Sequence, residues 1–369
     1  MKINVFTDYR FCACPVPTGV AKHIDFMVAG LVGNPGFEVE CLATKDQVGI
    51  RGQGLIGDLP CVRIPLSWCC ARELWTWTGL PVADKWVDDA DWIYCPKNDW
   101  IPSHRKSVKY AVTIHGASEL DSNYHSGCQS RTVRSAYGVL RSRQSYKRIC
   151  DRADVILTVS EWLKEFIMSR FHVAAERIVV VGNGVDQRFY DVYSDESQKE
   201  VEPYILCVGG LNHIDGGDRV VSLAENIRQS ELKLRVKVVG VEHDQVLRSQ
   251  AQKSGVVDFL GYVDHTALPR IMREALLLYY PTRYETFGMA SAEAMATGCP
   301  VVTSRCTAVP EIVGDCGCYV DVDNPVKVLE IVEAFLVDSS MRSDCSSKSH
   351  ERSLLFSWDH CVDKLKSVF

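Results

Sequence analysis

The stretch Arg283–Val302, which reads RYETFGMASAEAMATGCPVV, decides the fold prediction for this chain. Its first residues follow an apolar, strand-like run, and the small residues at Thr286–Gly288 predict a turn. A short helix is expected from Met289 onward, and Gly298 followed by Pro300 supplies the usual chemistry of a helix end. Strand, turn and helix in this order form the repeating unit of α/β folds with a parallel sheet.

Two glutamates flank this turn. Glu285 follows the predicted strand, and open α/β sheets bind their ligands at the carboxyl ends of the strands. Glu293 lies inside the helix, where its carboxylate can accept hydrogen bonds from a ribose diol. The backbone N–H groups around Phe287–Ala290 point from the helix start and form a ready anion site for a diphosphate. The alternative interpretation is that both glutamates are solvated surface charges, the usual fate of a single glutamate.

Apolar, β-rich runs alternate with helical stretches on both sides of this segment, which predicts an α/β protein throughout. In the first half the expected strands are Ile3–Phe6, Glu38–Leu42, Cys61–Ile64, Trp92–Cys95, Tyr110–Ile114, Val155–Val159 and Ile178–Val181. In the second half they are Tyr204–Val208, Leu234–Val239, Phe259–Leu260, Leu276–Tyr280, Pro300–Thr303 and Cys318–Val320. Asp191–Pro203 is polar, acidic and closed by a proline, so we interpret it as a linker. Amphipathic helices are expected at Val326–Val337 and Trp358–Phe369.

Composition narrows the class of protein. The chain has 369 residues, 46% of them hydrophobic and 24% charged, which fits a water-soluble protein of two domains. The net charge of −6 gives no global basic footprint, so we expect no nucleic-acid partner. Apolar runs such as Ala275–Pro281 are far shorter than the ~18–20 residues of a membrane-spanning helix. The start MKINVFTDYR shows no signal peptide, and we expect a cytoplasmic protein.

The 16 cysteines are scattered along the chain and do not predict a metal site. No CxxC pair occurs, and the CxC pairs Cys12/Cys14 and Cys316/Cys318 lack a histidine at zinc spacing. Free, mostly buried thiols are expected in a cytosolic setting.

The glutamate pair resembles the E-x7-E element of family 4 glycosyltransferases, and other pieces of the chain are similar to that family in the same order. These pieces are Thr18–Ile24, Ile114–Gly116, Ala153–Trp162, Arg177–Val181, Asn183–Asp186, Tyr204–Leu211, Gly317–Pro325 and Phe356–Phe369. The resemblance implies a GT-B fold, in which two Rossmann-like domains face each other across a cleft. Residues 1–190 would form the acceptor domain, completed by a return helix at 356–369. Residues 203–352 would form the donor domain.

The chain departs from the family where the donor diphosphate is usually held. The family pattern G-R-L-x3-K-G corresponds here to GGLNHIDG, so Gly210 stands where arginine is expected and Asp215 where lysine is expected. In addition, His115 is followed by Gly116, where many members carry aspartate. We expect Lys22 to supply the missing cation, with Arg219 as the second candidate. Asp215 is expected to point away from the diphosphate or to meet a sugar hydroxyl.

The resemblance implies a role for each matching residue. Glu293 would bind the donor ribose, Glu285 a hydroxyl of the transferred sugar, and His115 would lie near the sugar and phosphate. The other donor-binding candidates are Thr286, Phe287, Gly288, Met289, Gly209, Gly210, Gly19 and Lys22. Simpler interpretations remain open: a helix-surface charge for Glu293, a core histidine for His115 and an ordinary turn glycine for Gly19.

The implied reaction retains the anomeric configuration through an oxocarbenium-like state. The departing diphosphate would take the acceptor's proton, so no separate general base is required. The protein would mainly position the reactants, stabilise the leaving group and exclude water by domain closure. No cofactor and no metal are expected. The pairs Asp321/Asp323 and Asp89/Asp91 have DxD spacing, and we interpret neither as metal ligands.

Two features bear on the acceptor, which we expect to be a glycan, a lipid-linked sugar or a small molecule. Six of the eight tryptophans lie between Trp68 and Trp100, where they either contact sugar rings or pack in the core. The basic segment Arg131–Arg152 would contact an anionic membrane or a phosphorylated acceptor, or else is a solvated helix.

Three alternatives to a transferase remain. The missing arginine and lysine keep open a catalytically silent module that binds nucleotide or sugar. A nucleotide-sugar epimerase or a phosphorylase of GT-B shape would share the fold. A dinucleotide oxidoreductase is disfavoured because 208–217 does not fit G-x-G-x-x-G.

Overall fold

A computed structural model describes residues 1–6, 18–46, 59–87, 89–103, 107–120, 133–194, 202–241 and 244–369, without the side chains of 119 and 133–135. The cysteine pair Cys12/Cys14, the side chains of Arg131 and Arg134, and the middle of the predicted linker lie outside these residues. The chain divides into two compact units: 1–184 with 358–369 form the first unit, and 185–357 form the second. The sequence had placed the boundaries at 190, 203, 352 and 356.

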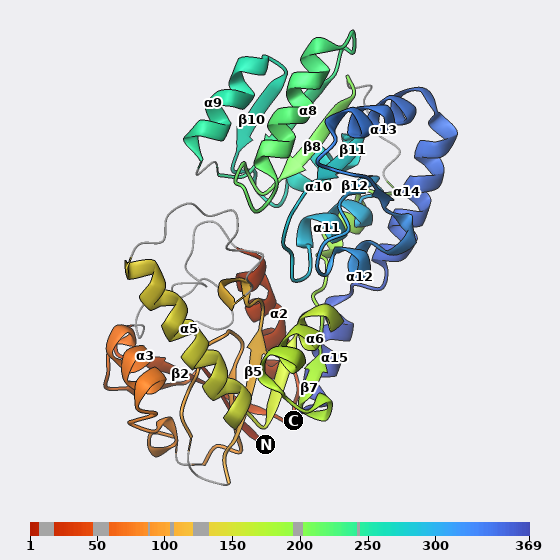
Figure 1. Ribbon diagram of the computed structural model, residues 1–369. Helices are drawn as coiled ribbons and strands as arrows, with labels where there is room; N and C mark the ends of the chain where they lie inside the picture. Colours follow the sequence, from red (N-terminus) through yellow and green to blue (C-terminus); the bar gives the residue numbers. More distant parts are fainter. Residues whose placement is uncertain are drawn as a thin grey trace. The chain divides into compact units, whose positions relative to one another are not determined.

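The first unit is built on a parallel sheet of seven strands in the order β3-β2-β1-β4-β5-β6-β7, with helices around it (Figure 1). Its strands are β1 (Lys2–Phe6), β2 (Glu38–Thr44), β3 (Cys61–Ile64), β4 (Trp92–Cys95), β5 (Lys109–Ile114), β6 (Val155–Thr158) and β7 (Ile178–Val180). Its helices are α2 (Gly19–Val32), α3 (Trp68–Trp77), α5 (Val133–Arg152), α6 (Glu161–Phe171) and α15 (Trp358–Lys366), with short 3-10 turns η2 (Ala83–Lys85), η3 (Ser118–Leu120) and η4 (Ala175–Arg177).

The second unit is built on a parallel sheet of six strands in the order β10-β9-β8-β11-β12-β13. Its strands are β8 (Tyr204–Val208), β9 (Arg235–Val239), β10 (Val257–Gly261), β11 (Leu277–Tyr280), β12 (Val301–Thr303) and β13 (Cys318–Tyr319). Its helices are α7 (Gln187–Asp191), α8 (Gly217–Gln229), α9 (Gln245–Ser254), α10 (Leu268–Glu274), α11 (Met289–Ala296), α12 (Val309–Val313), α13 (Pro325–Val337) and α14 (Ser339–Ser353), with the 3-10 turn η5 (Gly314–Cys316).

Both sheets reverse their strand order at one point, and this fixes where a ligand can bind. In the first unit the order reverses between β1 and β4, and in the second between β8 and β11. Loops that leave the two neighbouring strands at such a point diverge to opposite faces and open a crevice at the carboxyl edge of the sheet. The strand β11 is buried along its whole length, as expected for a central parallel strand covered on both faces.

The last helix of the chain completes the core of the first unit. Helix α15 packs against α2, which begins more than 300 residues earlier in the sequence (Figure 1). Trp358 stacks on Phe26 with the ring centroids 4.5 Å apart, and a Cβ at Gly30 would approach a methyl carbon of Val362 to 2.3 Å. This close packing explains why a segment that follows the second unit in the sequence belongs to the first. Among the described residues, no helix combines the length and the hydropathy that crossing a membrane requires.

We expect Trp358→Ala to destabilise the first unit by about 3–5 kcal/mol, because it removes a large side chain that is only 7% exposed. Thermal unfolding monitored by near-ultraviolet circular dichroism measures the effect. Leu355→Ala is the control: Leu355 is 60% exposed, so its loss should change stability by no more than about 0.5 kcal/mol. Equal effects of the two substitutions would show that α15 does not hold the first unit together.

Candidate functional site

The loops that follow β8 and β11 lie against each other in the second unit, at the point where the strand order reverses. The backbone N–H of Arg283 donates to the carbonyl oxygen of Ile214 at 2.8 Å. A Cβ at Gly216 would lie 2.2 Å from the carbonyl oxygen of Pro281, so the two loops touch through bare backbone. The glycine segment 209–216 and the glutamate segment 283–293 therefore form one site.

Glu285 is the titratable group at the centre of this site. Its carboxylate accepts a hydrogen bond from the Tyr280 hydroxyl, and its backbone N–H donates to Thr307 Oγ1 at 2.8 Å. The pKa of Glu285 is raised to about 7, mainly by burial and to a smaller extent by the neighbouring Asp215 carboxylate. Hydrogen bonds from Tyr280 and from the backbone of Thr286 and Gly288 act in the opposite direction. Glu285 is therefore partly protonated near neutral pH, which is unusual for a glutamate in a loop.

The start of α11 places the second glutamate. Gly288 has a φ of +96°, which lets the chain turn from the loop into the helix. The side chain of Phe287, just before the helix, is buried against Phe356. Glu293, one turn into the helix, is only 5% exposed. A buried carboxylate one turn inside a helix that begins at the carboxyl edge of the sheet is not the solvated surface charge of the alternative interpretation. Thr286 and Met289 complete this turn at half-buried positions.

The glycines after β8 have a structural role that the sequence did not reveal. The backbone N–H groups of Gly209 and Gly210 both donate to the carbonyl oxygen of Val239, at 2.9 and 3.0 Å. These two donors were expected to hold the diphosphate, and in this structure the β9 strand uses them. Gly210 has a φ of +78°, and a Cβ there would lie 2.5 Å from the carbonyl oxygen of Val241. The Val241 carbonyl therefore leaves no room for any side chain at position 210, and an arginine is excluded there.

Asp215 occupies the second departure from the family pattern and is held inside the loop. Its carboxylate accepts a hydrogen bond from the Asn212 side chain, and its backbone N–H donates to Asn212 Oδ1 at 2.9 Å. Burial raises the pKa of Asp215 above the usual range. Position 215, where a lysine was expected, thus carries a partly buried carboxylate.

Two arginines near the glutamate segment are neutralised by carboxylates. Arg219 forms a bidentate pair with Asp323 at 2.6 and 2.7 Å and also donates to the Pro281 carbonyl at 2.8 Å. Arg283 forms a bidentate pair with Asp218 at 2.6 and 2.7 Å. The second candidate for the missing cation, Arg219, therefore already has an anionic partner in this structure, which weakens its assignment.

The DxD pairs are used structurally as well. Asp323 is the partner of Arg219, and Asp91 Oδ2 accepts a hydrogen bond from the backbone N–H of Lys2 at 2.8 Å. Within the described ranges, no group of three or more histidine, cysteine or acidic side chains is arranged to hold a metal ion.

In the first unit, His115 follows β5 at the carboxyl edge of the sheet. Its Nε2 donates to the carbonyl oxygen of Pro96 at 2.8 Å, and its backbone N–H donates to Asn98 Oδ1 at 2.7 Å. Burial lowers the pKa of His115 to about 4, so the ring is neutral at physiological pH. Because a carbonyl can only accept, the proton resides on Nε2, and Nδ1 can accept a hydrogen bond but cannot donate one.

Residues that the sequence analysis did not assign hold this histidine in place. Asn98 also donates to the Gly116 carbonyl at 2.9 Å, and the Tyr146 hydroxyl bonds to the same carbonyl. His23 lies edge-on to His115 with the ring centroids 4.6 Å apart, and His23 Nδ1 is 2.7 Å from Asn183 Oδ1. His23 and Asn183 both belong to pieces of the chain that carry the family resemblance, which was the signal available for them.

Thr18–Ile24, which by its family resemblance would be a glycine-containing loop after the first strand, is the start of a helix. Gly19 is the first residue of α2, and Thr18 Oγ1 accepts the backbone N–H of Ala21 at 3.2 Å as the cap. Threonine is a strong N-cap, so the helix begins at Gly19, three residues before Lys22. Lys22 therefore projects from the first turn of α2 and not from a loop.

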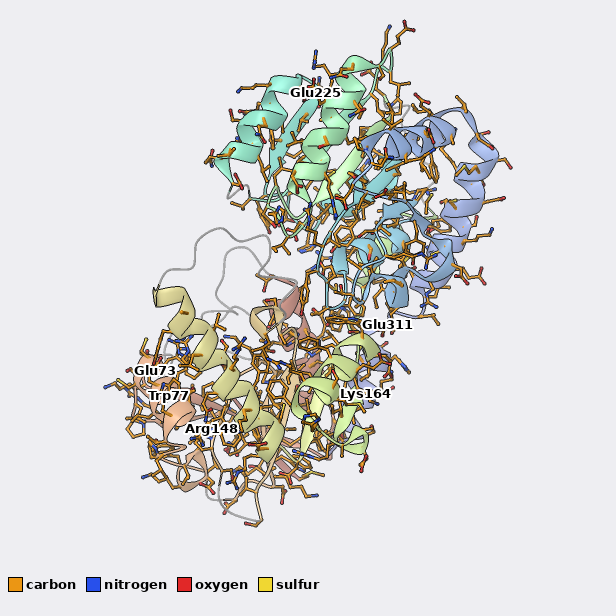
Figure 2. The ribbon with its side chains drawn as sticks, in the orientation of Figure 1. Glu73, Trp77, Arg148, Lys164, Glu225 and Glu311 are labelled. Atoms are coloured by element: carbon orange, nitrogen blue, oxygen red, sulfur yellow. The ribbon has the colours of Figure 1, made fainter. Side chains whose placement is uncertain are left out.

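The basic segment and the tryptophans are largely structural. Figure 2 shows Glu73 and Trp77 of α3 beside Arg148 of α5. Arg141 pairs with Glu73 at 3.2 Å, and Arg148 donates to the carbonyl oxygens of Thr76 and Trp77 at 2.6 and 2.8 Å. The core buries Trp68, Trp75, Trp92 and Trp100. Only part of the charge predicted for Arg131–Arg152 thus remains for a partner.

Comparison with solved structures identifies the class. The chain superposes on sucrose-phosphate synthase from Thermosynechococcus elongatus with a TM-score of 0.75 at 17% identity, covering 100% of this chain and 98% of that one. It superposes on HepE from Anabaena, solved with UDP and glucose, with a TM-score of 0.70 at 16% identity, covering 100% and 99%. Together with the two parallel sheets, these matches establish the GT-B fold.

The sequence comparisons then give the family. Residues 17–189 match the family described as Glycosyltransferase Family 4, and residues 202–338 match the one described as Glycosyl transferases group 1. The O-antigen chain mannosyltransferase B of Escherichia coli is 27% identical over 296 residues, covering 76% of this chain and 75% of that protein. The MMP alpha-(1->4)-mannosyltransferase of Mycolicibacterium hassiacum is 25% identical, covering 64% and 58%. The chain belongs to the family 4 glycosyltransferases.

Glu285 should make the stability of the second unit depend on pH. Its folded pKa of about 7 lies above the ordinary 4.5, so the native state binds more protons than the unfolded state between these values. Stability should therefore fall as the pH rises through this window, by on the order of 2 kcal/mol, and Glu285→Gln should abolish that loss. Urea unfolding at about pH 5 and pH 8 measures it, with the exposed Glu333→Gln as control. A pH-independent difference between wild type and Glu285→Gln would refute the assignment.

Gly210→Ala should destabilise the second unit more than Gly255→Ala. Both glycines have similar positive φ values, +78° and +72°, so an alanine suffers the same backbone strain at each. A Cβ at Gly255 has no atom within 4 Å, whereas at Gly210 it meets the Val241 carbonyl. We expect Gly255→Ala to cost about 1–2 kcal/mol and Gly210→Ala about 1–3 kcal/mol more. Thermal denaturation of both variants is the measurement, and equal losses would contradict the close approach.

Proposed function

We propose that the protein is a retaining, metal-independent hexosyltransferase that transfers a sugar from a nucleotide-sugar donor. The observation that carries the proposal is the pair Glu285 and Glu293, which lie at the carboxyl edge of the second unit's sheet where its strand order reverses. Ligands of open α/β sheets bind at this place. HepE, a structural relative, was solved with UDP-glucose, which supports a nucleotide-sugar of this kind.

Each glutamate has a distinct role in the proposal. Glu293 binds the ribose hydroxyls of the donor, because a buried carboxylate accepts two hydrogen bonds with little loss of conformational freedom. Glu285 binds a hydroxyl of the transferred sugar. Its pKa near 7 allows it either to accept or to donate a hydrogen bond, and the Tyr280 hydroxyl fixes its orientation.

His115 contributes to the transferred sugar as a neutral group. Its Nδ1 accepts a hydrogen bond from a sugar hydroxyl, while the Pro96 carbonyl and Asn98 hold the ring and the backbone. With its pKa near 4, His115 does not neutralise the leaving diphosphate. In the proposal the leaving diphosphate itself takes the acceptor's proton, and Lys22 supplies the positive charge that Arg219 does not.

The acceptor in the proposal is a glycan or a lipid-linked sugar bound by the first unit. Arg143, Lys147 and Arg170 line a hollow of about 380 Å³ between α5 and α6, together with one acid, Asp151, and with Leu140, which is 55% exposed. This combination of cations and an apolar side chain favours a peripheral contact with an anionic membrane surface on the cytoplasmic side. The charge that Arg141 and Arg148 were expected to add is used within the unit.

A second candidate is a catalytically silent module that binds a nucleotide-sugar. The paired arginines and the acid at position 215 favour it, because they leave the diphosphate with few cationic partners. A thermal-shift screen with UDP-, GDP-, dTDP- and ADP-sugars, followed by an assay of nucleotide release with and without acceptor, separates the candidates. Acceptor-dependent release supports the transferase, and binding without release supports the module. A change in the sugar without nucleotide release would identify an epimerase.

Glu293→Gln should weaken the binding of the donor nucleotide by about tenfold to a hundredfold, because it replaces charge-assisted hydrogen bonds at nearly constant volume. Isothermal titration with the nucleotide found in the screen measures the effect. Glu333→Gln removes the same charge from an exposed position of α13 and should leave the affinity unchanged. Unchanged affinity in Glu293→Gln would remove this residue from the donor site.

A further inference from the structure

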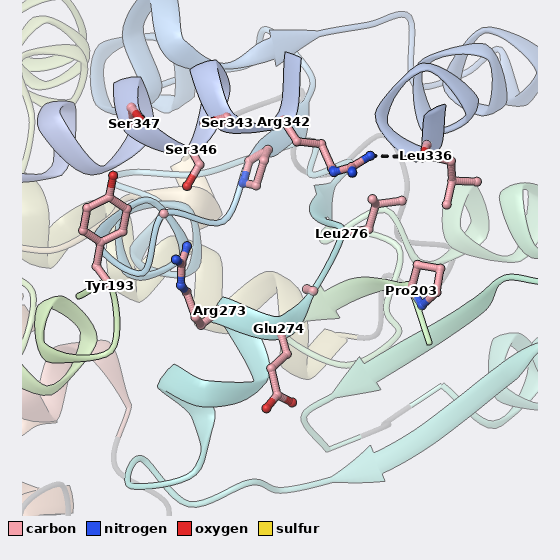
Figure 3. Close-up of a pocket in the computed structure, with 13 residues that line it drawn as sticks. Tyr193, Pro203, Arg273, Glu274, Leu276, Leu336, Arg342, Ser343, Ser346 and Ser347 are labelled. Carbon is pink, nitrogen blue, oxygen red and sulfur yellow. Dashed lines mark hydrogen bonds between the residues drawn. The ribbon is translucent and has the colours of Figure 1, made fainter. Parts of the chain in front are cut away.

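A separate cavity of about 580 Å³ lies in the second unit, at the edge of the sheet opposite to the glutamates (Figure 3). Its floor is formed by Pro203, Leu276 and Pro300, and each of these residues directly precedes a strand, β8, β11 or β12. Because the sheet is parallel, these are the amino ends of the strands. Glu285 follows the carboxyl end of β11, so the cavity is distinct from the donor site.

Two arginines give the cavity a positive charge. Arg273 closes α10, and its guanidinium lies over the ring of Tyr193, 5.1 Å from the centroid. Arg342 uses one nitrogen, Nη1, for the carbonyl oxygens of Phe335 and Leu336 (Figure 3). Within the part of the chain that the structure describes, the remaining donors of Arg342 have no hydrogen bond and no ion pair.

Among the residues that the structure describes, the cavity lining offers little negative charge to balance these arginines. Glu274 is its acidic lining residue, and in Figure 3 its side chain points away from Arg273 and Ser346. The Glu274 carboxylate pairs with Arg270 at 2.8 Å, so its charge is already compensated. Within the described lining, the arginines therefore outnumber the acids, and Arg273 also donates to the carbonyl oxygen of Thr297 at 3.4 Å.

Three serines of α14 add hydroxyl groups on the same side. Ser343, Ser346 and Ser347 are spaced so that they share one face of the helix, and all three line the cavity. A helical serine either faces solvent or bonds back to a carbonyl of the preceding turn, as Ser353 of the same helix does at 2.6 Å. Among the described residues, the hydroxyls of the three cavity serines make no such bond; Ser343 and Ser347 are exposed and Ser346 is half-buried.

We propose that this cavity binds a small phosphorylated metabolite, with Arg273, Arg342 and the three serines as the ligands of its phosphate oxygens. Guanidinium and hydroxyl donors match a group that has several acceptor oxygens and a double negative charge. The apolar floor accommodates the non-phosphate part, and the volume lies within the ~300–1,000 Å³ range of small-molecule sites. Because the two sites lie at opposite edges of the sheet, the phosphorylated metabolite and the nucleotide-sugar bind at the same time without competing.

The test is isothermal titration and thermal shift of the full chain with glucose 6-phosphate and with inorganic phosphate at constant ionic strength, in the absence and presence of saturating donor nucleotide. We expect binding under both conditions, with a rise in Tm of a few degrees. Arg273→Gln/Arg342→Gln should weaken binding at least about tenfold. Ser343→Ala/Ser346→Ala/Ser347→Ala tests the site without touching the Arg342 bonds to α13. Arg228→Gln is the control: it removes a cation from the exposed face of α8, and this variant should bind both probes with unchanged affinity.

Three outcomes overturn the proposal. Absence of binding by both probes does so, as does retention of full affinity in both multiple variants. Competition by the donor nucleotide would place the phosphate in the donor site instead. Stronger binding of glucose 6-phosphate than of inorganic phosphate supports a metabolite, whereas equal binding of the two would overturn that part and leave an inorganic anion site. None of these outcomes depends on transferase activity, so the proposal fails or stands separately from the proposed function.

Discussion

The candidate site of the second unit depends on a backbone contact that only glycine permits. The loop after β8 lies against the ends of β9 and β11, where Cβ atoms at Gly210 and Gly216 would come within 2.5 and 2.2 Å of the carbonyl oxygens of Val241 and Pro281. At position 210, where an arginine was expected from the family resemblance, this approach leaves no room for a side chain. Asp215, where a lysine was expected, instead places a second carboxylate near Glu285.

The negative charge of this site is reduced by protonation of Glu285 and by the pairing of carboxylates with arginines. Burial and the nearby Asp215 raise the pKa of Glu285 to about 7, so part of the negative charge is removed by protonation near neutral pH. The available arginines, Arg219 and Arg283, are paired with Asp323 and Asp218. A diphosphate that enters this site raises the local negative potential further and favours protonation of Glu285. Donor binding in the proposed function is therefore coupled to proton uptake, and the positive charge comes from a residue outside this sheet, for which Lys22 is proposed.

The sequence predicted the two sheets well because buried parallel strands are short apolar runs, such as LLYY in β11. It failed where contacts are long-range or where apolar periodicity is absent. Helix α14 was missed because SSMRSDCSSKSHERS buries only two serines and shows no apolar face. Asn98 and Tyr146 could not be assigned because folding, and not spacing, brings Asn98 to His115 and Tyr146 to Asn98 and Gly116. Gly19 was expected in a loop, although the threonine before it caps a helix.

The histidine pair of the first unit limits how the leaving group can be stabilised. His23 and His115 lie edge to face, and burial lowers the pKa of both rings, so neither carries a positive charge at neutral pH. The Pro96 carbonyl fixes the proton of His115 on Nε2, which leaves Nδ1 as an acceptor. An acceptor can orient a sugar hydroxyl, but it cannot stabilise charge that develops on a diphosphate. In the proposed reaction this stabilisation is assigned to Lys22, to the helix start at α11 and to the acceptor's own proton, and helix starts contribute only about 0.3–2 kcal/mol per charge. The transfer should consequently depend on bringing the acceptor hydroxyl against the diphosphate, which makes hydrolysis of the donor without acceptor slow.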